Sequence, residues 1–96
     1  MKNYWVYILT NMSNRVLYIG VTNNLRRRVW QHQTGTGSIF TKRYNLTKLV
    51  HSEHFTEITA AISREKELKG WRREKKGKLV ESHNPDWEDI TLAWRE

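Results

Sequence analysis

Apolar and polar residues alternate along two short stretches near the start of the chain, Tyr4–Thr10 and Val16–Thr22. Both stretches are rich in aromatic and β-branched residues, which favour strands. The residues between them, Asn11 to Arg15, include two asparagines and a serine and are typical of a turn. The pattern therefore predicts an antiparallel hairpin.

Successive side chains of a strand point to opposite faces of its sheet. In the predicted hairpin, one face carries the aliphatic set Val6, Ile8, Leu17 and Ile19. The other face carries Tyr7 and Tyr18, so two phenols are expected to come from neighbouring strands.

Helical spacing follows the hairpin. Asn24 is the predicted N-cap of a helix that runs to about Gln33 and ends before two glycines, with Leu25 and Val29 turned inward. Arg28 and His32 are four residues apart, so both are expected on one flank of this helix, beside its buried stripe.

The second half of the chain continues with alternating elements. We expect a short helix over Ser38–Arg43, a third strand over Leu46–Phe55, and a long helix that Thr56 caps and that ends at Lys69. A further short helix is expected over Glu74–Ser82, followed by an aromatic and acidic tail over 84–96. These strands and helices predict one domain of the α+β class, spanning 1–96.

One carboxylate interrupts the apolar stripe of the long helix. The positions predicted to face inward are Ile58, Ala61, Ile62, Glu65 and Leu68. A carboxylate among apolar side chains loses hydration unless a cation compensates. Two interpretations follow for Glu65: it is the ion-pair partner of a strand residue, or it is the ligand of a metal ion.

The net charge of +7 is unevenly distributed. Residues 1–80 carry 16 basic and 5 acidic side chains, whereas residues 81–96 carry 1 and 5. A basic body of this kind attracts polyanions, of which nucleic acid is the usual one. The side chains predicted to contact DNA are Arg26, Arg27, Lys42, Arg43, Lys69, Arg72, Arg73, Lys75 and Lys76; the alternative is that they form an ordinary solvated surface.

The cysteine content, the lengths of the apolar runs and the N-terminal sequence indicate where in the cell the protein is expected. The sequence contains no cysteine and no apolar run of the roughly 20 residues that a membrane span needs. No signal-peptide pattern follows Met1. We therefore expect a cytoplasmic protein without a membrane segment.

Together, Trp5-Val6-Tyr7, Tyr18-Ile19-Gly20, Arg28 and His32 resemble the signature of the GIY-YIG nucleases, in particular small stand-alone bacterial members. The second half of the signature matches literally. The first half keeps the tyrosine but has tryptophan where the family name has glycine. The resemblance assigns catalytic roles to Tyr7, Tyr18, Arg28, His32, Glu65 and Asn84, metal binding to Glu65, and the motif glycine to Gly20. Asn84 precedes Pro85, so a plain turn residue is the alternative there.

The resemblance implies a three-stranded antiparallel sheet flanked by helices in the order β-β-α-α-β-α, with the further short C-terminal helix after it. It also implies hydrolysis of DNA phosphodiester bonds with Mg²⁺ or Mn²⁺. The chemistry of the residues agrees: a guanidinium such as that of Arg28 stabilises charge that develops on phosphate oxygens. A hard cation can be held by one carboxylate, water and phosphate. A phenol could relay a proton from the attacking water. With no separate recognition domain expected in 96 residues, we predict selectivity for DNA structure or targeting by a protein partner. The alternatives are a DNA-binding module without substantial activity, and a protein-interaction domain that uses the tail.

Overall fold

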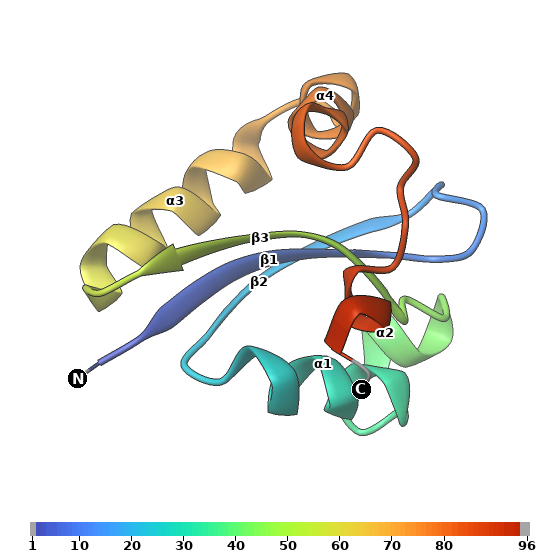
Figure 1. Cartoon of the computed structure of the whole chain (residues 1–96), viewed down its shortest axis with the longest axis horizontal. Coiled ribbons are helices and arrows are strands. Elements are labelled where there is room, and N and C mark those ends of the chain that lie inside the picture. Colours follow the sequence, from blue (N-terminus) through green and yellow to red (C-terminus); the bar gives the residue numbers. More distant parts are fainter. Residues whose placement is uncertain (1, 95–96) are drawn as a thin grey trace.

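The computed structural model describes residues 2–94 and has the predicted α+β architecture. Its three strands are β1 (Tyr4–Thr10), β2 (Leu17–Thr22) and β3 (Lys48–Phe55), arranged antiparallel in the order β2-β1-β3. Helices cover both faces of this sheet (Figure 1). One face carries α3 (Ile58–Gly70) and α4 (Arg73–His83); the other carries α1 (Leu25–Gln33), α2 (Ile39–Arg43) and a 3-10 helix, η1 (Ile90–Trp94).

The two faces of the sheet have separate apolar cores. On the side of α3 and α4, the buried residues are Val6, Ile8, Ile19, Val50, Ala61, Leu68 and Val80. On the side of α1, they are Tyr7, Leu9, Leu25, Val29, Leu46 and Leu49. The predicted division of the hairpin, with Val6, Ile8 and Ile19 on one face and Tyr7 on the other, is confirmed.

Several predicted boundaries differ from those in the structure. Glu57, rather than Thr56, is the N-cap of α3, and its side chain makes no cap hydrogen bond. The strand β3 begins at Lys48, because Leu46 lies in the loop before it and is buried in the core. The helix η1 was not predicted. The tail charges Arg95 and Glu96 lie outside the described residues.

The prediction of which residues of α3 face inward was partly wrong. Ile58 and Ile62 are 42% and 37% exposed, whereas Ala61 and Leu68 are fully buried. Residues seven apart lie almost in line along a helix, so the line from Ala61 to Leu68 is the one that faces the sheet. Ile58 and Ile62 lie to one side of that line, and the apolar stripe is narrower than the sequence suggested.

Among residues 2–94, no helix combines the length and the apolar character needed to cross a membrane.

Candidate active site

The centre of the site is a buried hydrogen-bonded chain between β1, α1 and α2. The hydroxyl of Tyr7 lies 3.0 Å from Nε2 of His32, and Nδ1 of the same imidazole lies 2.8 Å from Oγ1 of Thr41. All three side chains are about 1% exposed. Thr41 is held in turn by Ser38, the N-cap of α2, whose Oγ lies 2.8 Å from the Thr41 hydroxyl. The short helix α2 therefore fixes the far side of the imidazole.

Two glycines make room for this chain. Gly20 lies directly across from Tyr7 in the β1–β2 register, and a Cβ at Gly20 would come within 2.4 Å of the Tyr7 hydroxyl. A Cβ at Gly37 would come within 2.3 Å of Nδ1 of His32. The tyrosine ring thus lies over the backbone of β2, and the glycine of Tyr18-Ile19-Gly20 is explained by the space that this ring needs.

Tyr18 and Arg28 complete this side of the site. The ring centroid of Tyr18 lies 6.3 Å from that of Tyr7 and 5.4 Å from that of His32, so the two phenols and the imidazole form one group. Arg28 is half-buried on α1, one turn before His32, and its Nη1 donates to Oε1 of Gln31 at 3.0 Å. These four predicted residues are brought together, as the sequence analysis expected.

Burial and charge set the protonation states of this group. Burial raises the pKa of Tyr7 to about 12; Tyr18 and Glu65 act in the same direction, and Arg28 acts against them. Burial also lowers the pKa of His32 to about 4, and the positive charge of Arg28 adds to this effect. At neutral pH, Tyr7 is therefore a phenol and His32 is a neutral imidazole.

Glu65 approaches the same group from the other face of the sheet. Arg64 and Glu65 lie on opposite sides of the sheet-facing line of α3, and Arg64 reaches Glu53 on β3. Glu65 is consequently turned toward β2, at the other edge of the sheet, where its charge acts on the pKa of Tyr7. Its side chain is 16% exposed and lies 3.4 Å from Nζ of Lys69, measured at Oε2.

A groove of about 290 Å³ opens at this edge. Its lining comes from β2, α2, α3 and α4: Leu17, Tyr18, Ile19, Phe40, Lys69 and Lys76. The rings of Tyr18 and Phe40 lie 6.1 Å apart, centroid to centroid, so aromatic faces and two ammonium groups border one hollow.

Glu65 is the predicted metal ligand, and no cluster of acidic side chains surrounds it among the described residues. Within residues 2–94, there is no group of three or more histidine, cysteine, aspartate or glutamate side chains that could hold a metal ion. Glu65 would be the single protein ligand, with water and substrate oxygens in the other positions. Mg²⁺ tolerates this arrangement because it keeps several of its waters.

Asn84 lies apart from these residues. Its Nδ2 donates to the carbonyl oxygens of Val50, at 3.2 Å, and Glu88, at 2.8 Å, and its Oδ1 accepts from the Glu88 amide at 3.0 Å. The Val50 carbonyl is available because the β1–β3 register shifts at this point. Both polar atoms of the Asn84 side chain are thus engaged in hydrogen bonds that hold the tail against β3.

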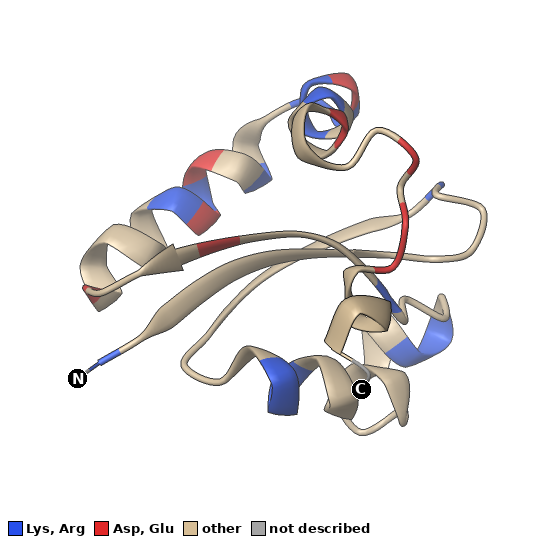
Figure 2. Cartoon of the chain, viewed as in Figure 1, with Lys and Arg blue, Asp and Glu red and all other residues tan. Residues whose placement is uncertain are grey.

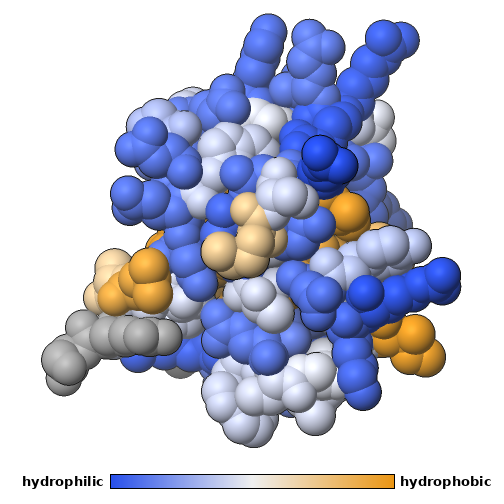
Figure 3. Space-filling view, turned by 90° about the vertical axis from the view of Figure 1, so that its right-hand side faces the viewer, coloured by the Kyte–Doolittle hydropathy of each residue, from blue (hydrophilic) through white to orange (hydrophobic). Residues whose placement is uncertain are grey.

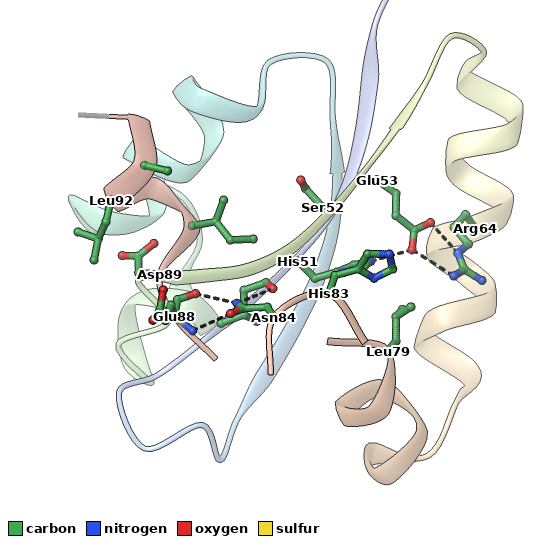
Figure 4. Close-up of a pocket in the computed structure, with 13 residues that line it drawn as sticks. His51, Ser52, Glu53, Arg64, Leu79, His83, Asn84, Glu88, Asp89 and Leu92 are labelled. Atoms are coloured by element: carbon green, nitrogen blue, oxygen red, sulfur yellow. Dashed lines mark hydrogen bonds and ion pairs between the residues drawn. The ribbon is translucent and has the colours of Figure 1, made fainter. Parts of the chain in front are cut away.

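The cavity beside Asn84, of about 560 Å³, is at the β3 edge (Figure 4). Three of the side chains that line it, His51, Glu53 and Arg64, are paired with one another. Nε2 of His51 lies 2.7 Å from Oε2 of Glu53, and Arg64 donates to both oxygens of the same carboxylate. Burial alone would raise the pKa of Glu53, but the hydrogen bonds from Arg64 and His51 lower it. This cavity contains none of the tyrosines, Arg28 or Glu65.

The basic residues predicted to contact DNA lie on helices on both sides of the sheet, except Arg72, which is the N-cap residue of α4 (Figure 2). Four of them also pack on aromatic rings of the chain: Arg26 on Trp94, Arg43 on Tyr44, Arg73 on Trp87, and Lys75 on Trp71. Arg73 additionally donates to the carbonyl of Asn14. Hydrophilic side chains cover most of the face drawn in Figure 3, and the apolar ones form small separate areas.

The fold and these residues define a GIY-YIG domain. The sequence profile of the GIY-YIG catalytic domain matches residues 3–78, and the chain belongs to this family of nucleases. The predicted resemblance is confirmed.

The relatives narrow the assignment to a group called UPF0213. The chain is 40% identical over 81 residues to a UPF0213 protein of Haloquadratum walsbyi, an alignment that covers 84% of this chain and 91% of that protein. It is 36% identical over 81 residues to one from Staphylococcus haemolyticus, covering 84% and 98%. The solution structure of a UPF0213 protein from Bacillus halodurans is similar, with a TM-score of 0.58, 30% identity, and coverage of 95% of this chain and 97% of that one.

Sequence reasoning missed three parts of the site: Gly37, Thr41 and the Glu65–Lys69 pair. The four-residue spacing of Glu65 and Lys69 on a helix was a usable signal for the pair. Nothing in the local sequence pointed to Gly37 or Thr41, because their contacts depend on how α2 folds back on α1.

Proposed function

We propose that this protein is an endonuclease that hydrolyses DNA phosphodiester bonds with Mg²⁺ or Mn²⁺ held by Glu65. The observation that carries the proposal is the convergence of Tyr7, Tyr18, Arg28, His32 and Glu65, from two strands and two helices, around the β2 edge of the sheet. A site built only to bind nucleic acid has no need of a carboxylate among its cations.

Arg28 is the group that acts on the phosphate. Its guanidinium is close enough to Tyr7 to affect the pKa of that hydroxyl. A phosphate oxygen placed beside Tyr7 would therefore be within reach of the planar fork of donors on Arg28. This fork stabilises the negative charge that gathers on the non-bridging oxygens during attack.

Tyr7 and His32 form a proton relay for the attacking water. With a pKa of about 12, Tyr7 is not a phenolate at neutral pH, so it accepts the proton of the water only while passing its own proton on. Nε2 of His32, 3.0 Å away, is the acceptor. The imidazole must then carry its own hydrogen on Nδ1 and donate it to Oγ1 of Thr41, which can itself donate to the Ser38 carbonyl at 3.3 Å.

A divalent ion on Glu65 would stabilise the charge of the leaving oxygen. Tyr18 borders the groove beside that position and is suited to orient the DNA strand.

Trp87 and Trp94 in the tail pack on Arg73 and Arg26, so these rings are already engaged within the chain. This contact weakens the alternative of a protein-interaction domain.

The experiment compares Glu65→Gln with Glu67→Gln. Glu67 lies on the same helix, is 54% exposed and pairs with Arg64, so it is a matched control. Both variants are incubated with duplex, single-stranded, flapped and branched DNA in Mg²⁺ or Mn²⁺, and their melting temperatures are measured. We expect Glu65→Gln to lose at least about 10²-fold in cleavage rate. Its stability should be unchanged or slightly raised, because a poorly solvated charge is removed.

The control should cleave at the wild-type rate. A folded Glu65→Gln protein that cuts every substrate as fast as wild type would refute the assignment. A large loss of stability would instead identify Glu65 as a structural ion-pair partner, since removing one partner of a buried pair costs about 3–5 kcal/mol.

A further inference from the structure

Lys69 has access to two different anionic positions. Its Nζ lies 3.4 Å from Oε2 of Glu65, one helical turn away on α3. The same side chain is 55% exposed and lines the groove at the β2 edge together with Lys76 of α4. One ammonium group therefore borders both the proposed metal ligand and the surface on which a DNA strand would lie.

Binding of a divalent ion and of the Lys69 ammonium to the Glu65 carboxylate at the same time is electrostatically unfavourable. Both are cations, and both are attracted to the same carboxylate. The Lys69 end of this pair is exposed to water, which screens the attraction, and ordering the long lysine side chain costs entropy, so the ammonium is held weakly. A doubly charged ion at Glu65 would displace the ammonium and repel it.

The groove at the β2 edge is the site available to the displaced Lys69 side chain. Lys76 lines the groove from the next helix, and the rings of Tyr18 and Phe40 line it as well, beside Leu17 and Ile19 of β2. Two ammonium groups around one hollow suit a phosphate, and the aromatic faces suit the adjoining sugar and base. The ligand class is the phosphate next to the one being cut.

We propose that Lys69 is an exchangeable cation: it neutralises Glu65 until a divalent ion binds there, and it then binds a substrate phosphate beside Lys76. This inference rests on the proposed function. It couples the two ligands reciprocally, because a phosphate that draws Lys69 away also leaves Glu65 free for the metal ion.

The first measurement is Mn²⁺ affinity without DNA, from the electron paramagnetic resonance signal of the free ion. Lys69→Gln should bind Mn²⁺ about two- to fivefold more tightly than wild type, the range that the worth of an exposed ion pair predicts. Lys76→Gln is the matched control and should stay within about twofold of wild type, since Lys76 shares the groove but not the pair with Glu65. Glu65→Gln should bind at least about tenfold more weakly, because it lacks the charged ligand.

The second measurement is the salt dependence of binding to a phosphorothioate oligonucleotide that resists cleavage, in EDTA and in Mg²⁺. In Mg²⁺, Lys69→Gln should show a slope of log K against log[salt] that is shallower than that of wild type by about 0.7–0.9, the value of one phosphate contact. In EDTA, the slope of Lys69→Gln should differ less from that of wild type, because Glu65 then holds Lys69 in the wild-type protein. The slope of Lys76→Gln should differ from that of wild type by the same amount in EDTA and in Mg²⁺.

The outcomes separate the two proposals. If Glu65→Gln binds Mn²⁺ as tightly as wild type, the metal assignment fails whatever Lys69 does. If Glu65→Gln loses Mn²⁺ but Lys69→Gln binds it like wild type, and its salt slope differs equally with and without Mg²⁺, the exchange is refuted while the metal site stands.

Discussion

The substitution Gly20→Ala tests whether the close packing of Tyr7 on the backbone of β2 positions the Tyr7 hydroxyl. The added methyl group would lie 2.4 Å from the Tyr7 hydroxyl and 2.5 Å from the ring carbon that carries it. Neither atom can easily retreat, because the ring is 1% exposed and its hydroxyl is hydrogen-bonded to His32. Either the ring must leave the imidazole or the backbone of β2 must move away from β1.

The cost follows from these two routes. Overpacking a filled core costs about 1–3 kcal/mol, and losing the buried hydrogen bond adds about 1 kcal/mol. Alanine recovers about 0.5–1 kcal/mol, because it has less freedom than glycine in the unfolded chain. We therefore expect a net loss of about 1–3.5 kcal/mol, which lowers the melting temperature of a domain of this size by about 4–8 °C for each kcal/mol lost.

Thermal unfolding and DNA cleavage are measured on the same preparation, with Gly70→Ala as the control. A Cβ at Gly70 meets nothing within 4 Å, and this residue ends α3, so the control should be as stable as wild type or more so by up to about 1 kcal/mol. Cleavage by the folded Gly20→Ala protein should fall about tenfold or more, because the relay geometry is lost. A variant with wild-type melting and cleavage would refute the claim that β2 positions Tyr7.

Three further predictions concern other residues. Arg28→Ala should lower the cleavage rate by about 10²–10³-fold while changing DNA binding little, whereas Arg26→Ala, on the other side of α1, should leave the rate per bound complex unchanged. Asn84→Ala should lower the free energy of unfolding by about 1–2 kcal/mol in denaturant titrations, through the lost bonds to Val50 and Glu88, without changing the cleavage rate of the folded protein. His32, with a pKa of about 4 in the fold and 6.5 in the unfolded chain, favours the unfolded state as it protonates. Stability should therefore fall by about 3 kcal/mol as pH drops from about 6.5 to 4, and His32→Gln should flatten that part of the curve.

The fold was largely predictable because its signals are local. Alternation in the hairpin fixed which face each strand buries, and Asn24 caps α1 as expected, with its side chain accepting from the Arg27 amide. The face of α3 was harder. Ile58 and Ile62 belong to the same apolar pattern as Ala61, but the packing of Ala61 against the sheet selects a line that leaves both isoleucines exposed.

The residues of the candidate site also differ in how far local sequence signals could predict their positions. The spacing of Tyr7, Tyr18, Arg28 and His32 was visible in the sequence, because a hairpin and one helical turn place them at regular positions. Their catalytic roles were assigned by resemblance. Asn84 was assigned by resemblance to a catalytic set, and its actual contacts depend on a tail that crosses the β3 edge.

Burial distinguishes the two halves of the proposed site by their charge. It raises the pKa of Tyr7 to about 12 and lowers that of His32 to about 4, so both side chains are neutral over the range between these values. A neutral pair carries no charge with which to attract the substrate phosphate, but it can move a proton between fixed atoms. In the proposed mechanism, the charged roles belong to Arg28, Glu65 and Lys69, which are less deeply buried than Tyr7 and His32. Because Tyr7 lies over Gly20 of β2 and Lys69 borders the same strand, the dry relay and the charged groove meet along one edge of a small sheet.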